Sequence, residues 1–393
     1  MNIELSQRVQ SIKPSPTLAV TARAAALKAA GHDIIGLGAG EPDFDTPQYI
    51  KDAAIAAMNK GFTKYTPVGG TASFKQAIID KFAGENQLQY TPKQILVSCG
   101  GKHSFFNLAQ ALLNKGDEVI IPAPYWVSYP DMVLLADATP VILEGTFEQG
   151  FKITPEQLDK AITPKTKLFV INSPSNPTGV NYTNDELIAL ANVLLKHPHV
   201  LVATDDMYEH ILWEGRPFKN ILNLCPALYE RTIVLNGVSK AYAMTGWRIG
   251  YAAGPEKLIQ AMDNIQSQST SNPTSIAQYA AEAALKGDQS FIEEMVGIFK
   301  SRHDFVHDAL KQIKGVRVLP AQGTFYIFPN MQEAIKNLGM KNDLELGEHL
   351  IEKAGVALVP GSAFGSEGHM RISFATSMEN LQKAMERLQK ALG

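Results

Sequence analysis

The sequence predicts an α/β protein with a large domain on a mainly parallel sheet covered by helices, and a smaller α+β domain. Short apolar runs alternate with helical patterns through the middle of the 393-residue chain, as is typical of a sheet covered on both faces. From about residue 291 long amphipathic helices replace this pattern. Single cores stop growing near ~250 to 300 residues. We therefore expect a large domain over residues 48–290, and a small domain formed by residues 291–393 and residues 1–47, which include an N-terminal arm.

The clearest local pattern is a strand, a glycine turn and a helix. Residues 94–98 are mostly apolar, Gly100 and Gly101 follow them, and residues 102–115 repeat apolar side chains at helical spacing. Further strands are predicted at residues 118–121, 167–171, 200–203, 232–235 and 248–252. In the second domain the pattern predicts helices at residues 291–313 and 378–392 and a strand at residues 323–328.

Charge and composition favour a small-molecule enzyme over a nucleic-acid or membrane protein. The net charge is −3, with 36 basic and 39 acidic residues interspersed, so no basic surface for nucleic acid or lipid is expected. Cys99 and Cys225 form no CxxC pair, and the N-terminus lacks a signal-peptide pattern. We expect a reduced, cytoplasmic protein. His197 and His199 flank a proline, which favours a loop over a metal site, and no metal is expected.

Polar residues follow five of the predicted strands. Ligands of open α/β sheets bind outside the carboxyl ends of the strands, so these residues are expected to meet in space. They are Gly100–Gly101, Tyr125–Trp126, residues 172–176, Asp205 and Lys240. Together they offer a helix N-terminus for a phosphate, an aromatic face, an acid and an amine.

Lys240 is the candidate nucleophile. A lysine amine held near other cations and away from water can lose its proton near neutral pH and form a Schiff base with an aldehyde. Arg248, eight residues further on, is a candidate ligand for a phosphate on the same molecule. These are the parts that a pyridoxal 5′-phosphate (PLP) site needs.

A dinucleotide site is the competing interpretation. Residues 33–40 contain glycines spaced as in the fingerprint G-x-G-x-x-G. Glu41 takes the place of the third glycine, and Pro42 and Pro47 interrupt the chain where a helix should begin. Nicotinamide binding is therefore not expected.

Several separate motifs resemble those of one enzyme family, in the same order along the chain. They are residues 38–44, 124–126, 172–179, 205–208 and 239–248, together with Lys64-Tyr65 and residues 370–373. From about Ser11 to the C-terminus the chain resembles the class I aminotransferases of PLP fold type I, and is most similar to bacterial aspartate aminotransferases of the Iβ subgroup. The resemblance implies PLP as cofactor.

The resemblance also implies roles around the cofactor ring. Lys240 would bind PLP covalently and later move the substrate α-proton. Asp205 would pair with the pyridine nitrogen and keep it protonated. Asn176 and Tyr208 would contact the phenolic oxygen, and Trp126 would stack on the ring. Trp126 and Asn176 are also expected to contact the substrate.

For the cofactor phosphate, the resemblance implies the backbone amides of Gly101 and Lys102, the side chain of Arg248, and Tyr65 from a partner subunit. A homodimer is therefore expected. Many relatives have a serine three residues before the lysine, where this chain has Gly237.

Ser239 or backbone amides are expected to compensate for that missing hydroxyl. For the substrate, Arg371 is expected to bind the α-carboxylate in a fork-like pair, beside the amide of Gly40.

The expected substrate depends on how this chain differs from the other subgroup of aspartate aminotransferases. The other aspartate aminotransferase subgroup uses an arginine in the segment that here spans residues 265–274, and this segment has none. The resemblance implies Lys102, Ser15 and Thr17 as ligands of the distal carboxylate instead. A charge-assisted contact is worth about 1.5 to 3 kcal/mol. For Lys102, a lysine in the first helical turn that only meets solvent remains the alternative.

The sequence thus predicts an aspartate aminotransferase that transfers the amino group of L-aspartate to 2-oxoglutarate by a ping-pong cycle. An aspartate/prephenate or aromatic aminotransferase is the first alternative, and a PLP-dependent C–S lyase is a more distant one. A cofactor-sensing regulator would need a DNA-binding segment, for which the chain has neither room nor a basic patch.

Overall fold

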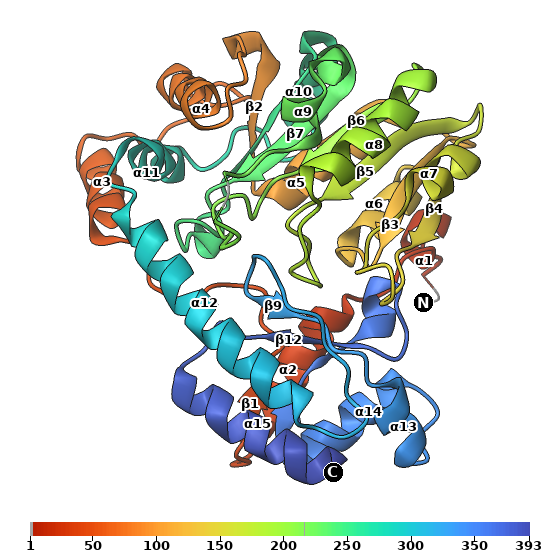
Figure 1. The fold of residues 1–393 in the computed structure, drawn as a ribbon. Helices are drawn as coiled ribbons and strands as arrows, with labels where there is room; N and C mark the ends of the chain where they lie inside the picture. Colours follow the sequence, from red (N-terminus) through yellow and green to blue (C-terminus); the bar gives the residue numbers. More distant parts are fainter. Residues whose placement is uncertain (1–2, 216) are drawn as a thin grey trace.

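The computed structural model describes residues 3–215 and 217–393. Figure 1 shows a sheet with its covering helices and, beneath it, a second group of elements that includes α2 (Pro16–Ala29), α12 (Ser290–Lys311) and α15 (Met378–Leu392). The long helix α12 runs from the first group into the second. Among the helices of these two ranges, none is long and apolar enough to cross a membrane.

A seven-stranded sheet forms the centre of the first group. Its strands lie in the order β2 (Ile95–Ser98), β8 (Gly250–Ala253), β7 (Thr232–Gly237), β6 (Leu201–Asp205), β5 (Thr166–Asn172), β3 (Glu118–Ala123) and β4 (Thr139–Glu144). Only β8 runs antiparallel to its neighbours, β2 and β7. The other neighbouring pairs are parallel. The predicted α/β fold with a mainly parallel sheet is therefore confirmed.

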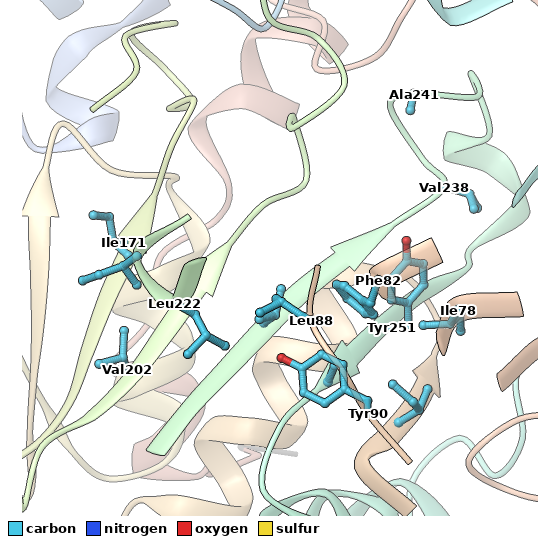
Figure 2. Packing of buried hydrophobic residues seen from close by; sticks show 14 of the residues in the cluster. Ile78, Phe82, Leu88, Tyr90, Ile171, Val202, Leu222, Val238, Ala241 and Tyr251 are labelled. Carbon is cyan, nitrogen blue, oxygen red and sulfur yellow. The ribbon is translucent and has the colours of Figure 1, made fainter. Parts of the chain in front are cut away.

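Both faces of the sheet are buried, because successive side chains of a strand point to opposite faces. In β5, Leu168 and Val170 join one core, whereas Phe169 and Ile171 join the other. The first core is covered by α5 (Gly101–Leu112), α6 (Ser128–Leu135) and α10 (Glu256–Ser267). The second is covered mainly by α3 (Gln48–Asn59), α4 (Ala72–Glu85), α8 (Asn184–Lys196) and α11 (Ser275–Lys286). Figure 2 shows part of this second core, with Phe82 of α4 beside Tyr251 of β8.

The second group of elements has a core of its own. Apolar side chains of α12 and α15 pack there against the short strands β9 (Tyr326–Ile327), β11 (Val359–Pro360) and β12 (Met370–Ser373). Within α12, Ile292 belongs to the second core of the sheet, whereas Met295 and Phe299 belong to the core formed by α12, α15 and the short strands. We therefore propose that the boundary between the large and the small domain lies near residue 291. The remaining elements include α1 (Gln7–Gln10), β1 (Ile35–Gly36), α7 (Pro155–Ala161), α9 (Ile221–Leu224), α13 (Gln332–Asn337), α14 (Asp343–His349) and β10 (Val356–Ala357).

Several predicted elements are shorter than the apolar pattern suggested. Helix α5 ends at Leu112 and not at residue 115, because Leu113 is extended. Strand β8 begins at Gly250 and not at residue 248, because Arg248 has the left-handed backbone angle φ of 56°. In residues 323–328 only Tyr326–Ile327 pair as a strand, after Thr324 with a φ of 65°. Such backbone turns depend on contacts that lie far away in the sequence.

Candidate active site

A cavity of about 380 Å³ lies at the carboxyl edge of the sheet. Every site residue predicted from the sequence lines it, with the exception of Tyr65. These residues are Ser15, Thr17, Gly40, Gly101, Lys102, Trp126, Asn176, Asp205, Tyr208, Ser239, Lys240, Arg248 and Arg371. The chain thus brings segments from both groups of elements to one place.

The strands explain why these residues meet. Asp205 is the last residue of β6 and pairs with Asn172, the last residue of β5. Lys240 follows the end of β7 by three residues. Arg248 precedes β8, which runs in the opposite direction, so the beginning of β8 lies at the same edge as the ends of the parallel strands.

Lys240 lies partly buried in the cavity, where its Nζ donates a hydrogen bond to the carbonyl oxygen of Gly40. Burial and the positive charges of Arg371 and Arg248 lower the pKa of Lys240 to about 8, although Glu41 and Asp205 act in the opposite direction. A larger share of this amine is therefore uncharged at neutral pH than in an exposed lysine, as a nucleophile requires.

Asp205 accepts hydrogen bonds on both carboxylate oxygens. The hydroxyl of Tyr129 donates to Oδ2, and the backbone amide of Met207 donates to Oδ1 at 3.2 Å. Burial raises the pKa of Asp205, and the two hydrogen bonds and the positive charge of Lys240 counteract this effect. A bound cation would complete the stabilisation of the carboxylate form.

A cradle for an anion lies at the N-terminus of α5. Gly100 has a φ of 93°, and a Cβ atom there would lie 2.3 Å from Nη2 of Arg248. A Cβ atom on Gly101 would lie 2.5 Å from Cε of Met207. Arg248 donates to the carbonyl oxygens of Thr245 at 2.8 Å and Cys99 at 3.2 Å. The absence of side chains at these glycines thus lets the helix N-terminus lie beside a guanidinium group, an arrangement that suits a phosphate.

Gly237 packs closely against the backbone at the beginning of β8. A Cβ atom at this position would lie 3.0 Å from Cα of Gly250 and 3.1 Å from the carbonyl oxygen of Ile249. A serine would therefore require the neighbouring strand to shift. Ser239 is buried and lines the cavity, so its hydroxyl is available close by.

Arg371 is a buried cation, only 2% exposed. Its Nη1 donates to Oδ1 of Asn176 at 3.1 Å, and its Nη2 donates to the carbonyl oxygen of Gly38 at 2.7 Å. The guanidinium lies 4.4 Å from the ring centre of Tyr326 and 5.0 Å from that of Phe364. Its buried Nε has no hydrogen-bond partner within residues 3–215 and 217–393. These neighbours are all neutral, so the group is suited to an anionic ligand.

The remaining wall of the cavity carries the residues predicted for a distal carboxylate. Ser15 caps α2 by accepting from the amide of Leu18 at 3.5 Å. The buried Oγ1 of Thr17 has no hydrogen-bond partner in the part of the chain that the structure describes. Nζ of Lys102 lies 5.2 Å from the ring centre of Trp126. Burial and the charge of Arg248 lower the pKa of Lys102, against the effect of Asp131.

Tyr65 and Tyr208 have contrasting positions. Tyr65 is 92% exposed and lies outside the cavity of its own chain, so its contribution across a subunit boundary stays a prediction. Tyr208 is buried, and its hydroxyl lies 3.2 Å from that of Tyr326.

Sequence reasoning missed two residues of the site, Tyr129 and Tyr326. Tyr129 lies in the first turn of α6, three residues after Trp126, and the centres of the two rings are 5.2 Å apart. Its closeness in sequence to a predicted site residue was a usable signal. Tyr326 comes from a different part of the chain, within an apolar strand, and its local sequence gives no sign of its role.

Comparisons with known proteins show the family to which the chain belongs. Residues 32–388 match the family model for aminotransferase class I and II. The chain is 62% identical to the aspartate/prephenate aminotransferase of Nitrosomonas europaea, over 99% of this chain and 100% of that one. It is 53% identical to the aspartate aminotransferase of Geobacillus stearothermophilus, over 99% and 98% of the two chains.

Solved structures show the same similarity. The aspartate aminotransferase of Rhizobium meliloti has a TM-score of 0.96 at 46% identity, with 100% of this chain and 99% of that chain covered. The aspartate aminotransferase of Thermus thermophilus with maleate has a TM-score of 0.94 at 43% identity, with both chains fully covered. The chain belongs to the class I and II aminotransferases, and it is an aminotransferase enzyme. The predicted family and fold type are confirmed.

Proposed function

We propose that this enzyme transfers the amino group of L-aspartate to 2-oxoglutarate with PLP as cofactor. The observation that carries the proposal is the amine of Lys240, whose pKa is lowered to about 8 in a cavity that also holds a partly buried acid and two arginines. The donor set fits PLP, which combines an aldehyde, a pyridine nitrogen and a phosphate. When bound, PLP supplies a ring that accepts the electron pair left behind when the substrate loses its α-proton.

The residues near Lys240 supply the positions for this chemistry. Asp205 would hold a proton on the pyridine nitrogen, because a carboxylate stabilises a neighbouring positive charge. Asn176 and Tyr208 would donate hydrogen bonds to the phenolic oxygen, and Trp126 would cover the ring. The Nζ atom of Lys240 would carry the α-proton of the substrate during transfer.

The phosphate would bind at the N-terminus of α5, to the amides of Gly101 and Lys102, to the guanidinium of Arg248 and to Ser239. We propose that Tyr65 of a partner subunit completes this site in a homodimer.

Exposed apolar side chains in the segment that precedes Tyr65 support a homodimer. Ile55 and Met58 are 49% and 45% exposed on α3, and Phe62 is 39% exposed beyond its end. A second copy of the chain would remove these groups from water. The predicted cytoplasmic location stays part of the proposal.

Amino and 2-oxo acids would bind in the part of the cavity that contains Arg371 and Gly40. Arg371 would hold the α-carboxylate, because its charge is otherwise surrounded by neutral partners, and the amide of Gly40 would close over the same group. Lys102, Ser15 and Thr17 would bind the distal carboxylate of aspartate and glutamate. The unpartnered hydroxyl of Thr17 within the described chain supports this placement.

Prephenate is a second candidate substrate. The Nitrosomonas europaea relative, at 62% identity, is named an aspartate/prephenate aminotransferase. Prephenate also carries two carboxylates, so the same pair of cationic groups suits it.

The test is a spectral cycle with the purified protein. A visible absorption band of bound PLP should disappear on addition of aspartate, with release of oxaloacetate, and 2-oxoglutarate should restore it. The same assay with glutamate and the keto acid prephenate tests the second candidate. Release of ammonia and pyruvate from a β-thio amino acid without any acceptor would indicate a C–S lyase. A protein that binds no PLP would contradict the proposal.

A further inference from the structure

Tyr326 joins the two sides of the cavity. It lies in β9, in the core that contains α12 and α15, and only 1% of its surface is exposed. Its side chain nevertheless lines the cavity. None of the roles proposed above involves this residue.

The ring and the hydroxyl of Tyr326 make different contacts. The guanidinium of Arg371 lies 4.4 Å from the ring centre. The hydroxyl accepts a hydrogen bond from the hydroxyl of Tyr208 at 3.2 Å. A Cβ atom on Gly40 would lie 3.4 Å from this same hydroxyl. One side chain therefore contacts a proposed substrate ligand, a proposed cofactor ligand and the segment that accepts the hydrogen bond of Lys240.

The backbone around Tyr326 is fixed on both sides. Tyr326 pairs with Ser373 in β12, the strand that carries Arg371. The amide of Thr324 donates to the carbonyl oxygen of Ile211 at 2.8 Å, three residues beyond Tyr208. The ring is thus tied to both of the segments whose side chains it contacts.

We propose that Tyr326 is a positioning residue that sets the Tyr208 hydroxyl and the Arg371 guanidinium relative to each other. The proposal rests on the function proposed above, because it concerns the two ligands of that site. A hydroxyl has one proton to donate but can also accept, so the bond between the two hydroxyls must reverse when Tyr208 donates to the phenolic oxygen. Tyr326 then donates to the oxygen of Tyr208, which fixes the rotation of that hydroxyl and strengthens it as a donor. The ring stabilises the position of the guanidinium by a cation–π contact at 4.4 Å.

Two variants separate these effects. Tyr326→Phe keeps the ring and removes the hydroxyl. It should raise the pH midpoint of the visible absorption band by about 0.5 to 1 unit, because Tyr208 becomes a weaker donor to the phenolic oxygen. Its dissociation constant for maleate, a non-reacting dicarboxylate, should stay within about twofold. Tyr326→Leu removes both groups and should also weaken maleate binding by roughly 5- to 30-fold.

Tyr182→Phe is the matched control. Tyr182 is buried, and its hydroxyl accepts from the amide of Ile153 at 3.0 Å, away from the cavity lining. This variant should leave the band midpoint and maleate binding unchanged. If circular dichroism shows that Tyr326→Leu does not fold, Tyr326→Met replaces it as the variant that lacks the ring.

An unchanged midpoint in Tyr326→Phe, or unchanged maleate binding in the folded variant without a ring, would overturn the inference. Failure of the proposed function itself looks different. In that case the unaltered protein would show no visible band with PLP, and the role of Tyr326 would fall with it.

Discussion

The hydroxyl of Tyr129 donates a hydrogen bond to Oδ2 of Asp205, between helix α6 and the end of β6. Both side chains lie at the carboxyl edge of the sheet, where Asp205 is partly buried and only 2% of Tyr129 is exposed. A hydrogen bond to a buried carboxylate stabilises its charged form. Tyr129 therefore helps to keep Asp205 ionised, against the burial that raises the pKa of this acid.

Tyr129→Phe should raise the pKa of Asp205 further, because the carboxylate loses a donor while burial persists. The acidic limb of the pH–rate profile should move to higher pH, and kcat should fall by roughly 10- to 100-fold, as expected for a hydrogen bond to a charged group worth about 1.5 to 3 kcal/mol. The profile is measured with aspartate and 2-oxoglutarate, beside Tyr182→Phe. An acidic limb at the same pH as in the unaltered enzyme would show that Tyr129 has no such role.

Lys102→Ala should weaken dicarboxylic substrates selectively. Removal of the cation should lower kcat/KM for aspartate and glutamate by roughly 10- to 100-fold, and that for alanine and phenylalanine much less. Lys115→Ala is the control, since Lys115 is exposed beyond the end of α5. Equal losses with all four amino acids would remove Lys102 from substrate selection, and would favour the alternative of a solvent-facing lysine.

Arg371→Lys keeps the charge but loses the planar fork that binds Asn176 and Gly38 and that we propose binds a carboxylate as well. The dissociation constant of maleate should rise roughly 10- to 100-fold. Arg387→Lys is a control, because Arg387 also binds a backbone carbonyl and a carboxylate, both of Asp33, outside the cavity. Maleate binding that survives in Arg371→Lys would argue against a fork-like contact.

A buried ion pair between Lys81 and Glu209 supports the segment that carries Tyr208. The side chains of Asn86 and Asn236 each donate to Glu209 at 2.7 Å. Burial tends to raise the pKa of Glu209, but Lys81 and the other partners outweigh it and lower the value from 4.5 to about 2. The pair should therefore stabilise the fold above pH 4.5, and this contribution should be lost as the pH falls towards 2.

Glu209→Gln should lower the free energy of unfolding by up to about 3 to 5 kcal/mol at pH 7, because the buried Lys81 then keeps only the partly exposed Glu85, 3.5 Å away, as an anionic partner. The difference from the unaltered protein should shrink between pH 4.5 and 2. Denaturant titrations at several pH values measure both effects. Glu186→Gln is the control, since Glu186 and its partner Lys152 form an ion pair that is partly exposed. This variant should lower the free energy of unfolding by less than about 1 kcal/mol. A similar loss in the free energy of unfolding for both variants would contradict the stabilising role of the buried pair.

The sheet and most of the cavity could be predicted from local sequence. Apolar runs predict strands, and polar residues such as Asp205 and Lys240 stand at the ends of these strands or within a few residues of them. Chain topology then brings strand ends together, so their meeting needed no knowledge of distant contacts. Roles such as that of Arg371 came from the resemblance, because one arginine in a short strand has no local signature.

What escaped prediction depends on contacts between distant segments. Tyr326 meets Arg371 and Tyr208 only because β9 and β12 pair and the chain folds back onto the sheet. The left-handed backbone of Arg248 likewise shortened a predicted strand. Tyr65 illustrates a different case, because its predicted partner belongs to a second chain.

The most direct test of the central claim is borohydride reduction of the PLP-loaded protein, followed by peptide mapping. Reduction fixes a Schiff base as a stable amine, so the pyridoxyl label should be recovered on the peptide that contains Lys240, and Lys240→Ala should remove it. Recovery of the label on another lysine, or on none, would contradict the account of this site.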